Sequence, residues 1–166
     1  MARIERLRED DWAVFRELRL RSLLDSPDAF GSAYGDESSW SEPTWRDWAA
    51  GRWRGGIAAV FACRRDDGTP VGTATGAVYD AEPHIAHVYA MWVAPDARGS
   101  GVGRALLEAV VGWARDRGGE RLVLSVTESN EIGRRFYEAC GFVDTGERDV
   151  LREGSAIRTR ILSMPL

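Results

Sequence analysis

The stretch that decides the fold is the glycine-rich segment Arg98-Gly99-Ser100-Gly101-Val102-Gly103-Arg104 in the middle of the chain. Before it, residues 84–93 are mostly apolar on both faces, which predicts a central strand that ends before Pro95. After it, apolar residues recur at helical spacing to about Arg117, where two glycines end the pattern. A short β-rich run follows at 122–127. The order strand, helix, strand predicts a βαβ unit with two parallel strands.

Further elements are expected on both sides of this unit, and together they predict one mixed α/β domain over residues 1–166. The expected elements are a strand at 2–7, a helix from Asp10 or Asp11 to about 24, an irregular loop at 25–43, a short helix at 43–51, a hairpin of strands 57–65 and 71–79, a helix at 130–140, and an antiparallel pair of strands at 142–150 and 157–164.

The composition is typical of a globular protein, since 44% of the 166 residues are hydrophobic and 29% are charged. A chain of this length can bury its own core. The formal charge of −4 argues against nucleic acid as a partner. All 22 basic residues are arginines, which excludes Schiff-base chemistry and a phosphate-binding loop that depends on lysine.

Cysteine and histidine are too few and too scattered to predict a metal site. Cys63 and Cys140 form no CxxC pair, and His84 and His87 have no companions at metal-site spacing. No run of about 18 apolar residues occurs, and the first residues lack the pattern of a signal peptide. We therefore expect no membrane as a partner and a reduced cytoplasmic protein.

The glycine-rich segment favours an anion as its ligand. Alternating glycines allow a ligand to approach the backbone closely, and the first turn of the next helix offers free amides and a positive dipole end. Arg98 and Arg104 flank these amides, so the segment suits a pyrophosphate; a plain turn is the alternative reading. A dinucleotide fingerprint would need a glycine where Arg104 stands, which argues against a nucleotide-dependent oxidoreductase.

Two motifs resemble the GNAT superfamily of N-acyltransferases. Its acetyl-CoA-binding motif is similar to Val93-x-Pro95-x-x-Arg98-Gly99-x-Gly101-x-Gly103-Arg104-x-x-Leu107, and its second block is similar to Asn130-x-x-Gly133-x-x-Phe136-Tyr137-Glu138-x-x-Gly141-Phe142. The resemblance covers about residues 84–143, with Gly133 where the family often has alanine. It extends weakly to Arg19-Leu20-Arg21 and to Asp25-Ser26-Pro27-x-Ala29-Phe30 on the acceptor side. It implies a curved, mostly antiparallel sheet with a central, splayed pair of parallel strands and flanking helices.

The resemblance also implies a function: transfer of an acetyl group from acetyl-CoA, the co-substrate, to a primary amine of a small molecule or peptide by direct attack. Pantetheine would enter between the splayed strands and pair with the backbone near Met91 and Val93, and Asn130 would help to orient it. The pyrophosphate would lie on the amides of Arg98, Gly99, Ser100, Gly101, Val102, Gly103 and Arg104. The alternative is a non-catalytic acyl-CoA-binding sensor, and both a monomer and a homodimer remain open.

Within the resemblance, Tyr137 matches the tyrosine that serves as general acid toward the coenzyme sulfur; a core aromatic beside Phe136 is the alternative. Three candidates remain for the base. His87 is one, because strand alternation places it on the same face as Tyr89, Met91 and Val93. Glu128 and a water relay through backbone carbonyls are the others, and a partly buried structural histidine is the alternative for His87. His84 is expected on the opposite face, in a structural or exposed position.

The acceptor side is less defined. Trp40, Trp45, Trp48 and Trp53 either line an acceptor pocket or fix a short helix to the sheet, and we favour packing for Trp48 and Trp53. Acidic side chains near the groove would attract a cationic amine such as a polyamine, an aminoglycoside or a peptide N-terminus, although a solvated acidic face is the alternative. These residues are Glu37, Glu42, Asp47, Asp80 and Glu82.

Overall fold

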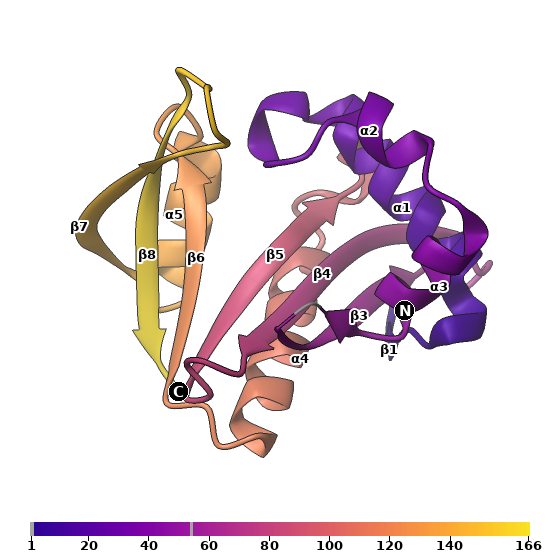
Figure 1. Ribbon diagram of the computed structural model, residues 1–166, viewed down its shortest axis with the longest axis horizontal. Helices are drawn as coiled ribbons and strands as arrows, with labels where there is room; N and C mark the ends of the chain where they lie inside the picture. Colours follow the sequence, from indigo (N-terminus) through magenta and orange to yellow (C-terminus); the bar gives the residue numbers. More distant parts are fainter. Residues whose placement is uncertain (1, 54) are drawn as a thin grey trace.

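The computed structural model describes residues 2–53 and 55–166, which form one twisted sheet with helices on both faces (Figure 1). In chain order the elements are β1 (Arg3–Arg6), α1 (Trp12–Asp25), α2 (Tyr34–Ser38), α3 (Glu42–Ala49), β2 (Arg52–Trp53), β3 (Gly56–Arg64), β4 (Pro70–Tyr79), β5 (Ile85–Val93), α4 (Val102–Asp116), β6 (Arg121–Thr127), α5 (Glu131–Ala139), β7 (Val143–Val150) and β8 (Arg158–Pro165). Short 3₁₀ turns occur at Glu9–Asp11, Pro27–Ala29 and Pro95–Ala97.

The sheet has the order β1-β3-β4-β5-β6-β8-β7, with β2 paired to β3. Strands β5 and β6 are parallel, and the other described pairs are antiparallel. The parallel pair is joined only where Ile85–His87 meet Arg121–Val123, and beyond this point the two strands diverge (Figure 1). The predicted fold class is therefore confirmed, including the splayed central pair.

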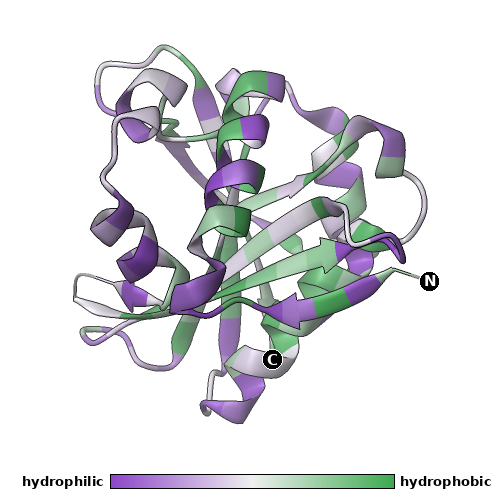
Figure 2. Ribbon diagram, turned by 90° about the vertical axis from the view of Figure 1, so that its right-hand side faces the viewer, coloured by the Kyte–Doolittle hydropathy of each residue, from purple (hydrophilic) through white to green (hydrophobic). Residues whose placement is uncertain are grey.

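Helix α4 packs closely against one face of β4 because two glycines of that strand remove the side chains between them. A Cβ at Gly72 would lie 2.9 Å from Leu106 of α4, and one at Gly76 would lie 2.8 Å from Trp113. Helix α1 also contacts β4. Asp25, the last residue of α1, accepts a hydrogen bond from Trp92 of the neighbouring strand β5. The central strands between the two helices are predominantly apolar (Figure 2).

Strand β5 contains a β-bulge that the alternating sequence pattern does not reveal. Tyr89 pairs with Thr75, yet the next paired residue of β5, Trp92, pairs with Thr73. Two residues of β5 therefore lie opposite one residue of β4, and Ala90 takes a φ of 50°. Such a bulge bends the strand and shifts the alternation of its side chains by one position.

The bulge corrects one prediction. His87 was expected to share a face with Val93, but Val93 pairs with Gly72, whose missing side chain faces α4. Trp92 instead shares the face of His87 and Tyr89, since cross-strand partners point to the same side of a sheet. The expectation was wrong because strict alternation ends at Ala90.

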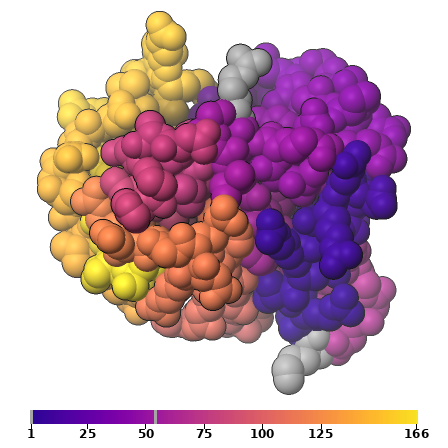
Figure 3. Space-filling model, turned by 60° about the horizontal axis from the view of Figure 1, so that its bottom comes forward, coloured from indigo at the N-terminus to yellow at the C-terminus, as the bar shows by residue number. Residues whose placement is uncertain are grey.

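The predicted loop at 25–43 is also incomplete, because it contains helix α2. A tertiary contact holds this short helix: Glu37 is buried against Arg19 of α1. The other expected elements are present within a few residues of their predicted bounds. On the face shown in Figure 3, the N-terminal segments and the C-terminal strands lie on opposite sides of the middle of the chain. None of the described helices combines the length and apolar character needed to cross a membrane.

Candidate active site

A cavity of about 460 Å³ lies where β5 and β6 separate. Residues 88–91 of β5 and 124–127 of β6 form two of its walls. The end of β7 and the segment around Phe30 form further walls. Arg152, which follows β7, connects these two walls by donating a hydrogen bond of 3.1 Å to the carbonyl of Phe30. The space between the parting strands is thus a cavity with walls from four segments of the chain.

Tyr137 on α5 lines this cavity. Its ring packs edge-on against Phe136 at 5.2 Å and against Phe142 at 5.8 Å, measured between ring centroids. Burial, and to a smaller extent Cys140, raises the pKa of the Tyr137 phenol. Among the described residues its hydroxyl has no hydrogen-bond partner. A neutral phenol with a free O–H group is the form that a general acid requires.

Asn130 lines the same cavity and begins α5. Its side-chain oxygen accepts a hydrogen bond of 2.9 Å from the amide of Gly133. A Cβ at Gly133 would lie 2.5 Å from the Asn130 amide nitrogen, so a larger residue there would require the Asn130 side chain to shift. This contact explains why Asn130 and Gly133, the first two residues defined in the second motif, lie three positions apart.

The glycine-rich segment forms an open loop before α4. Gly99 and Gly101 adopt φ values of 76° and 88°, which favour glycine, and nothing lies within 4 Å of a Cβ built on either residue. Within the described chain, the amides of residues 99–104 donate to no backbone or side-chain acceptor. Free amides, an open approach and a helix N-terminus together fit a phosphate group.

The resemblance places the amide of Arg98 at the pyrophosphate, and in the structure this amide donates to the carbonyl of Pro95 at 3.4 Å. Its guanidinium donates to the carboxylate of Asp25 at 2.6 Å and to the carbonyl of Val93 at 3.0 Å. Asp25 accepts a further hydrogen bond of 2.9 Å from Trp92 through the same oxygen. Burial opposes ionisation of Asp25, but the hydrogen bonds from Trp92, Ser26 and Arg98 outweigh it and lower the carboxyl pKa.

Through these contacts Arg98 fixes the start of the loop to the end of α1. Arg104 is exposed, and its guanidinium donates a hydrogen bond of 3.5 Å to the carbonyl of Ala139 at the end of α5. Arg104 therefore has more free guanidinium donors for a ligand than Arg98 has.

His87 lies behind Tyr89 and is not among the residues that line the cavity. Its ring stacks on Tyr89 at 5.8 Å and meets Tyr79 edge-on at 5.4 Å. Its Nε2 atom is buried without a hydrogen-bond partner among the described residues. Burial lowers the pKa of His87, with Glu82 opposing and Arg121 adding to the shift. His84 is exposed, as expected.

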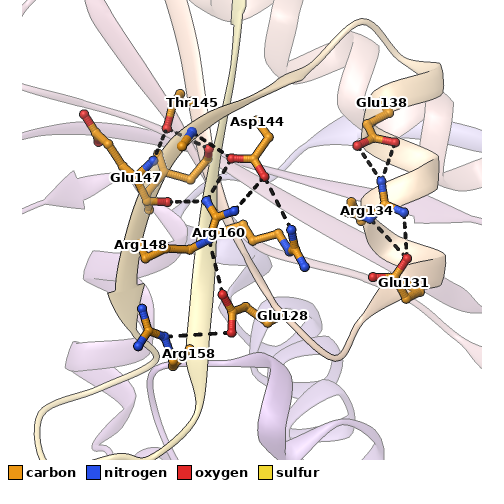
Figure 4. A network of polar contacts seen from close by, with 12 residues as sticks. Glu128, Glu131, Arg134, Glu138, Asp144, Thr145, Glu147, Arg148, Arg158 and Arg160 are labelled. Carbon is orange, nitrogen blue, oxygen red and sulfur yellow. Dashed lines mark hydrogen bonds and ion pairs between the residues drawn. The ribbon is translucent and has the colours of Figure 1, made fainter.

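Glu128 belongs to a network of ion pairs outside the cavity (Figure 4). Its carboxylate lies 3.2 Å from Arg148 and 3.8 Å from Arg158. Arg148 also pairs with Asp144 at 2.9 Å, and this hydrogen bond is the main cause that lowers the pKa of Asp144 to about 2. Glu128 is thus engaged by two arginines. Among the described residues, no group of three His, Cys, Asp or Glu side chains is arranged to hold a metal ion.

The acceptor side of the cavity is aromatic. Six aromatic side chains besides Tyr137 line it: Phe15, Phe30, Trp40, Trp48, Trp53 and Tyr89. Trp45 is 1% exposed and packs against Phe15 and Trp40, so it is the most buried of the four tryptophans considered for the acceptor side. Trp48 packs against the core, as favoured, and it also lines the cavity, as does Trp53.

Most of the acidic residues expected to attract a cation are paired. Glu37 accepts two hydrogen bonds from Arg19, at 2.8 and 2.9 Å, and both side chains line the cavity. On the surface, Glu42 pairs with Arg46 at 2.8 Å and Asp47 with Arg52 at 2.6 Å. These arginines neutralise three of the five carboxylates.

Asp149, at the end of β7, also lines the cavity and has no ion pair with any described residue. No sequence motif marks Asp149, which reaches the cavity because it pairs with Thr159 of β8, itself paired with Thr127 of β6.

Comparisons with known proteins agree with this architecture. A sequence profile described as the Acetyltransferase (GNAT) family matches residues 5–142. Mycothiol acetyltransferase from Salinispora arenicola (strain CNS-205) is 44% identical over 61 residues, which cover 36% of this chain and 20% of that protein. Aminoglycoside N(6')-acetyltransferase type 1 from Stenotrophomonas maltophilia is 34% identical over 100 residues, which cover 52% of this chain and 61% of that protein. The chain thus spans less than two thirds of the length of either relative.

A solved structure extends the comparison to the whole chain. YncA from Salmonella typhimurium, solved with its cofactor acetyl-CoA, matches with a TM-score of 0.79 and 19% sequence identity, covering 100% of this chain and 94% of that one. At this identity the match concerns the fold alone. Since the family profile spans both glycine motifs and both parting strands, this chain belongs to the GNAT family of acetyltransferases.

Proposed function

We propose that this protein transfers an acetyl group from acetyl-CoA to a primary amine. The observation that carries the proposal is the position of Tyr137, whose phenol has no hydrogen-bond partner among the described residues and lines the cavity between β5 and β6. The free amides of the glycine-rich loop, which follows the end of β5, supply the second requirement, a place for a pyrophosphate.

The residues present fit the coenzyme. Amides 99–104 would hold the pyrophosphate, and Asn130 would contact the pantetheine arm at the cavity wall. Met91 lies in the bulge and has no paired residue on β4, so its backbone is available to a strand-like ligand. The carbonyl of Val93 already accepts a hydrogen bond from Arg98, which leaves Met91 as the better backbone partner.

In the proposed reaction the neutral amine attacks the thioester carbonyl carbon, a C–N bond forms and the C–S bond breaks. The departing sulfur takes the phenolic proton of Tyr137, and solvent returns a proton to the phenolate. The attacking nitrogen must also lose one proton. Glu128 is paired with two arginines and His87 lies outside the cavity lining, so a water relay along the backbone carbonyls of the wall is the route that we favour.

The base role of His87 remains a prediction with its own test. If His87 takes the proton of the amine, the His87→Gln variant loses the acidic limb of the pH–rate profile while its acetyl-CoA affinity is unchanged. If the water relay operates, the profile keeps its shape.

The experiment that tests the proposed function has two parts. Isothermal titration calorimetry measures the binding of acetyl-CoA, and a thiol reagent measures release of coenzyme A with a panel of primary amines. We expect micromolar binding and amine-dependent release. Binding without release from any amine would favour the non-catalytic sensor, and an absence of binding would contradict both functions.

A further inference from the structure

The aromatic part of the cavity carries information about the amine that it accepts. Two of its aromatic pairs are stacked with nearly parallel planes: Trp40 and Trp48 at 5.2 Å and 25°, and Trp53 and Tyr89 at 5.6 Å and 16°. Trp48 and Trp53 join the two pairs edge-on at 4.7 Å. The four rings thus form one continuous wall, which we call the aromatic wall (Trp40, Trp48, Trp53 and Tyr89). A wall of aromatic rings favours an acceptor group that is itself aromatic and can pack against these rings.

The charges around the cavity point to a single positive charge on the acceptor. Only two of the lining residues are acidic, Glu37 and Asp149. Glu37 is 3% exposed and engaged on both carboxylate oxygens by Arg19, so the pair has no net charge. Asp149 is thus the one lining carboxylate without an ion pair to a described residue. A polycation entering this cavity would bring several charges out of water with one counter-charge to meet them, which is unfavourable.

From these two observations we infer that the acceptor is an arylalkyl monoamine, a primary amine on a short chain that ends in an aromatic ring. The ring packs against the aromatic wall, and the single ammonium group is drawn in by Asp149 before it loses its proton. This inference rests on the proposed function and narrows its substrate class. It also disfavours the polyamines and aminoglycosides that the acidic sequence pattern suggested.

Binding is the direct test. The protein saturated with coenzyme A is titrated calorimetrically with 2-phenylethylamine, spermidine and kanamycin, and release of coenzyme A from acetyl-CoA is measured with the same three amines. We expect a dissociation constant for 2-phenylethylamine at least tenfold lower than for either polycation, and the same order in kcat/KM. Equal or tighter binding of spermidine or kanamycin, or no binding of 2-phenylethylamine, would overturn the inference.

A variant pair locates the binding. Trp53→Leu keeps an apolar side chain but removes one face of the wall, and we expect it to weaken 2-phenylethylamine binding about tenfold with no change for acetyl-CoA. Trp12→Leu is the matched control, because Trp12 lies under Arg46 at 5.6 Å and does not line the cavity. Equal affinities for the amine in the Trp53→Leu variant and the control would also contradict the inference.

The two measurements separate this inference from the proposed function. Tight binding of 2-phenylethylamine without release of coenzyme A would support the substrate class and reject the transfer reaction. Release of coenzyme A with spermidine or kanamycin, but not with 2-phenylethylamine, would support the transfer reaction and reject the substrate class.

Discussion

At the scale of single residues, the structure separates the role of the Tyr137 hydroxyl from that of its ring. The ring packs against Phe136 and Phe142, whereas the hydroxyl bonds to no described residue. Tyr137→Phe should therefore fold normally, bind acetyl-CoA with unchanged affinity and lose about 10²-fold in kcat, the usual contribution of a general acid. Thiol-release kinetics and calorimetry measure the two quantities, and an unchanged kcat would remove Tyr137 from the mechanism.

His87 gives a prediction about stability. Burial keeps the folded pKa of His87 below its unfolded value of about 6.5, so the unfolded chain takes up a proton that the folded chain does not. The contribution of His87 is therefore intact above pH 6.5 and is lost as the pH falls below it. Thermal unfolding between pH 7.5 and 5 should show a falling Tm in the wild type and a smaller fall in His87→Gln.

The exposed histidine supplies the control for that experiment. His84 is 66% exposed at its side chain, and its Nδ1 atom lies 3.9 Å from Glu120. His84→Gln should reproduce the wild-type decrease in Tm. The same decrease in His87→Gln would show that the lost stability comes from other groups.

At the scale of elements, Asp25 couples the end of α1 to the glycine-rich loop through Arg98, and to β5 through Trp92. Asp25→Asn removes the charge from both hydrogen bonds, so the loop is held less firmly before the coenzyme binds. We expect the KM for acetyl-CoA to rise about fivefold, with little change in kcat or in the KM for the amine.

Asp28→Asn is the matched control for this change. Asp28 is exposed in the turn that follows α1 and forms no hydrogen bond or ion pair with the described residues of the loop, so the KM values of this variant should be those of the wild type. A rise in both KM values for Asp25→Asn would indicate a general loss of structure instead of a positioning role.

The elements that the sequence predicted are those whose signals are local. Three of these signals act within a few residues: the apolar run of β5, the glycines before α4 and the Asn130 cap of α5. The βαβ unit and the second motif could therefore be predicted from the sequence. Helix α2 depends on Glu37 meeting Arg19, which lies 18 positions earlier, and its own composition gives no such signal. The bulge at Ala90 likewise depends on how β4 and β5 pair.

The site was predicted unevenly for the same reason. Tyr137 and Asn130 line the cavity as their motif suggested, whereas the roles expected for Arg98, Trp48 and Trp53 depend on distant partners. No pattern near Asp149 links it to the residues of α1 and β5 that share the cavity with it.

At the scale of the whole molecule, the buried pair of Arg19 and Glu37 joins α1 to α2 at the acceptor side. Glu37→Gln leaves the buried guanidinium without its counter-charge, and we expect a loss of about 3 kcal/mol in the free energy of unfolding in urea. The double variant Arg19→Met with Glu37→Leu removes both charges and should be more stable than Glu37→Gln alone.

An exposed ion pair serves as the comparison. Glu42→Gln breaks a pair with Arg46 on the surface of α3, and it should change the free energy of unfolding by about 0.5 kcal/mol or less. Similar losses for Glu37→Gln and Glu42→Gln would mean that the pair inside the cavity wall contributes no more than one in solvent.

The short contact between β5 and β6 has a consequence for how firmly the two halves of the sheet hold together. Among the described residues, the paired positions of the two strands are Ile85–His87 and Arg121–Val123, so we expect local opening beyond this short contact. A coenzyme that lies between β5 and β6, as an additional strand does, would link the unpaired edges of these two strands. Deuterium uptake at 88–93 should then slow markedly when acetyl-CoA is added, whereas uptake within β3, remote from this contact, should stay the same.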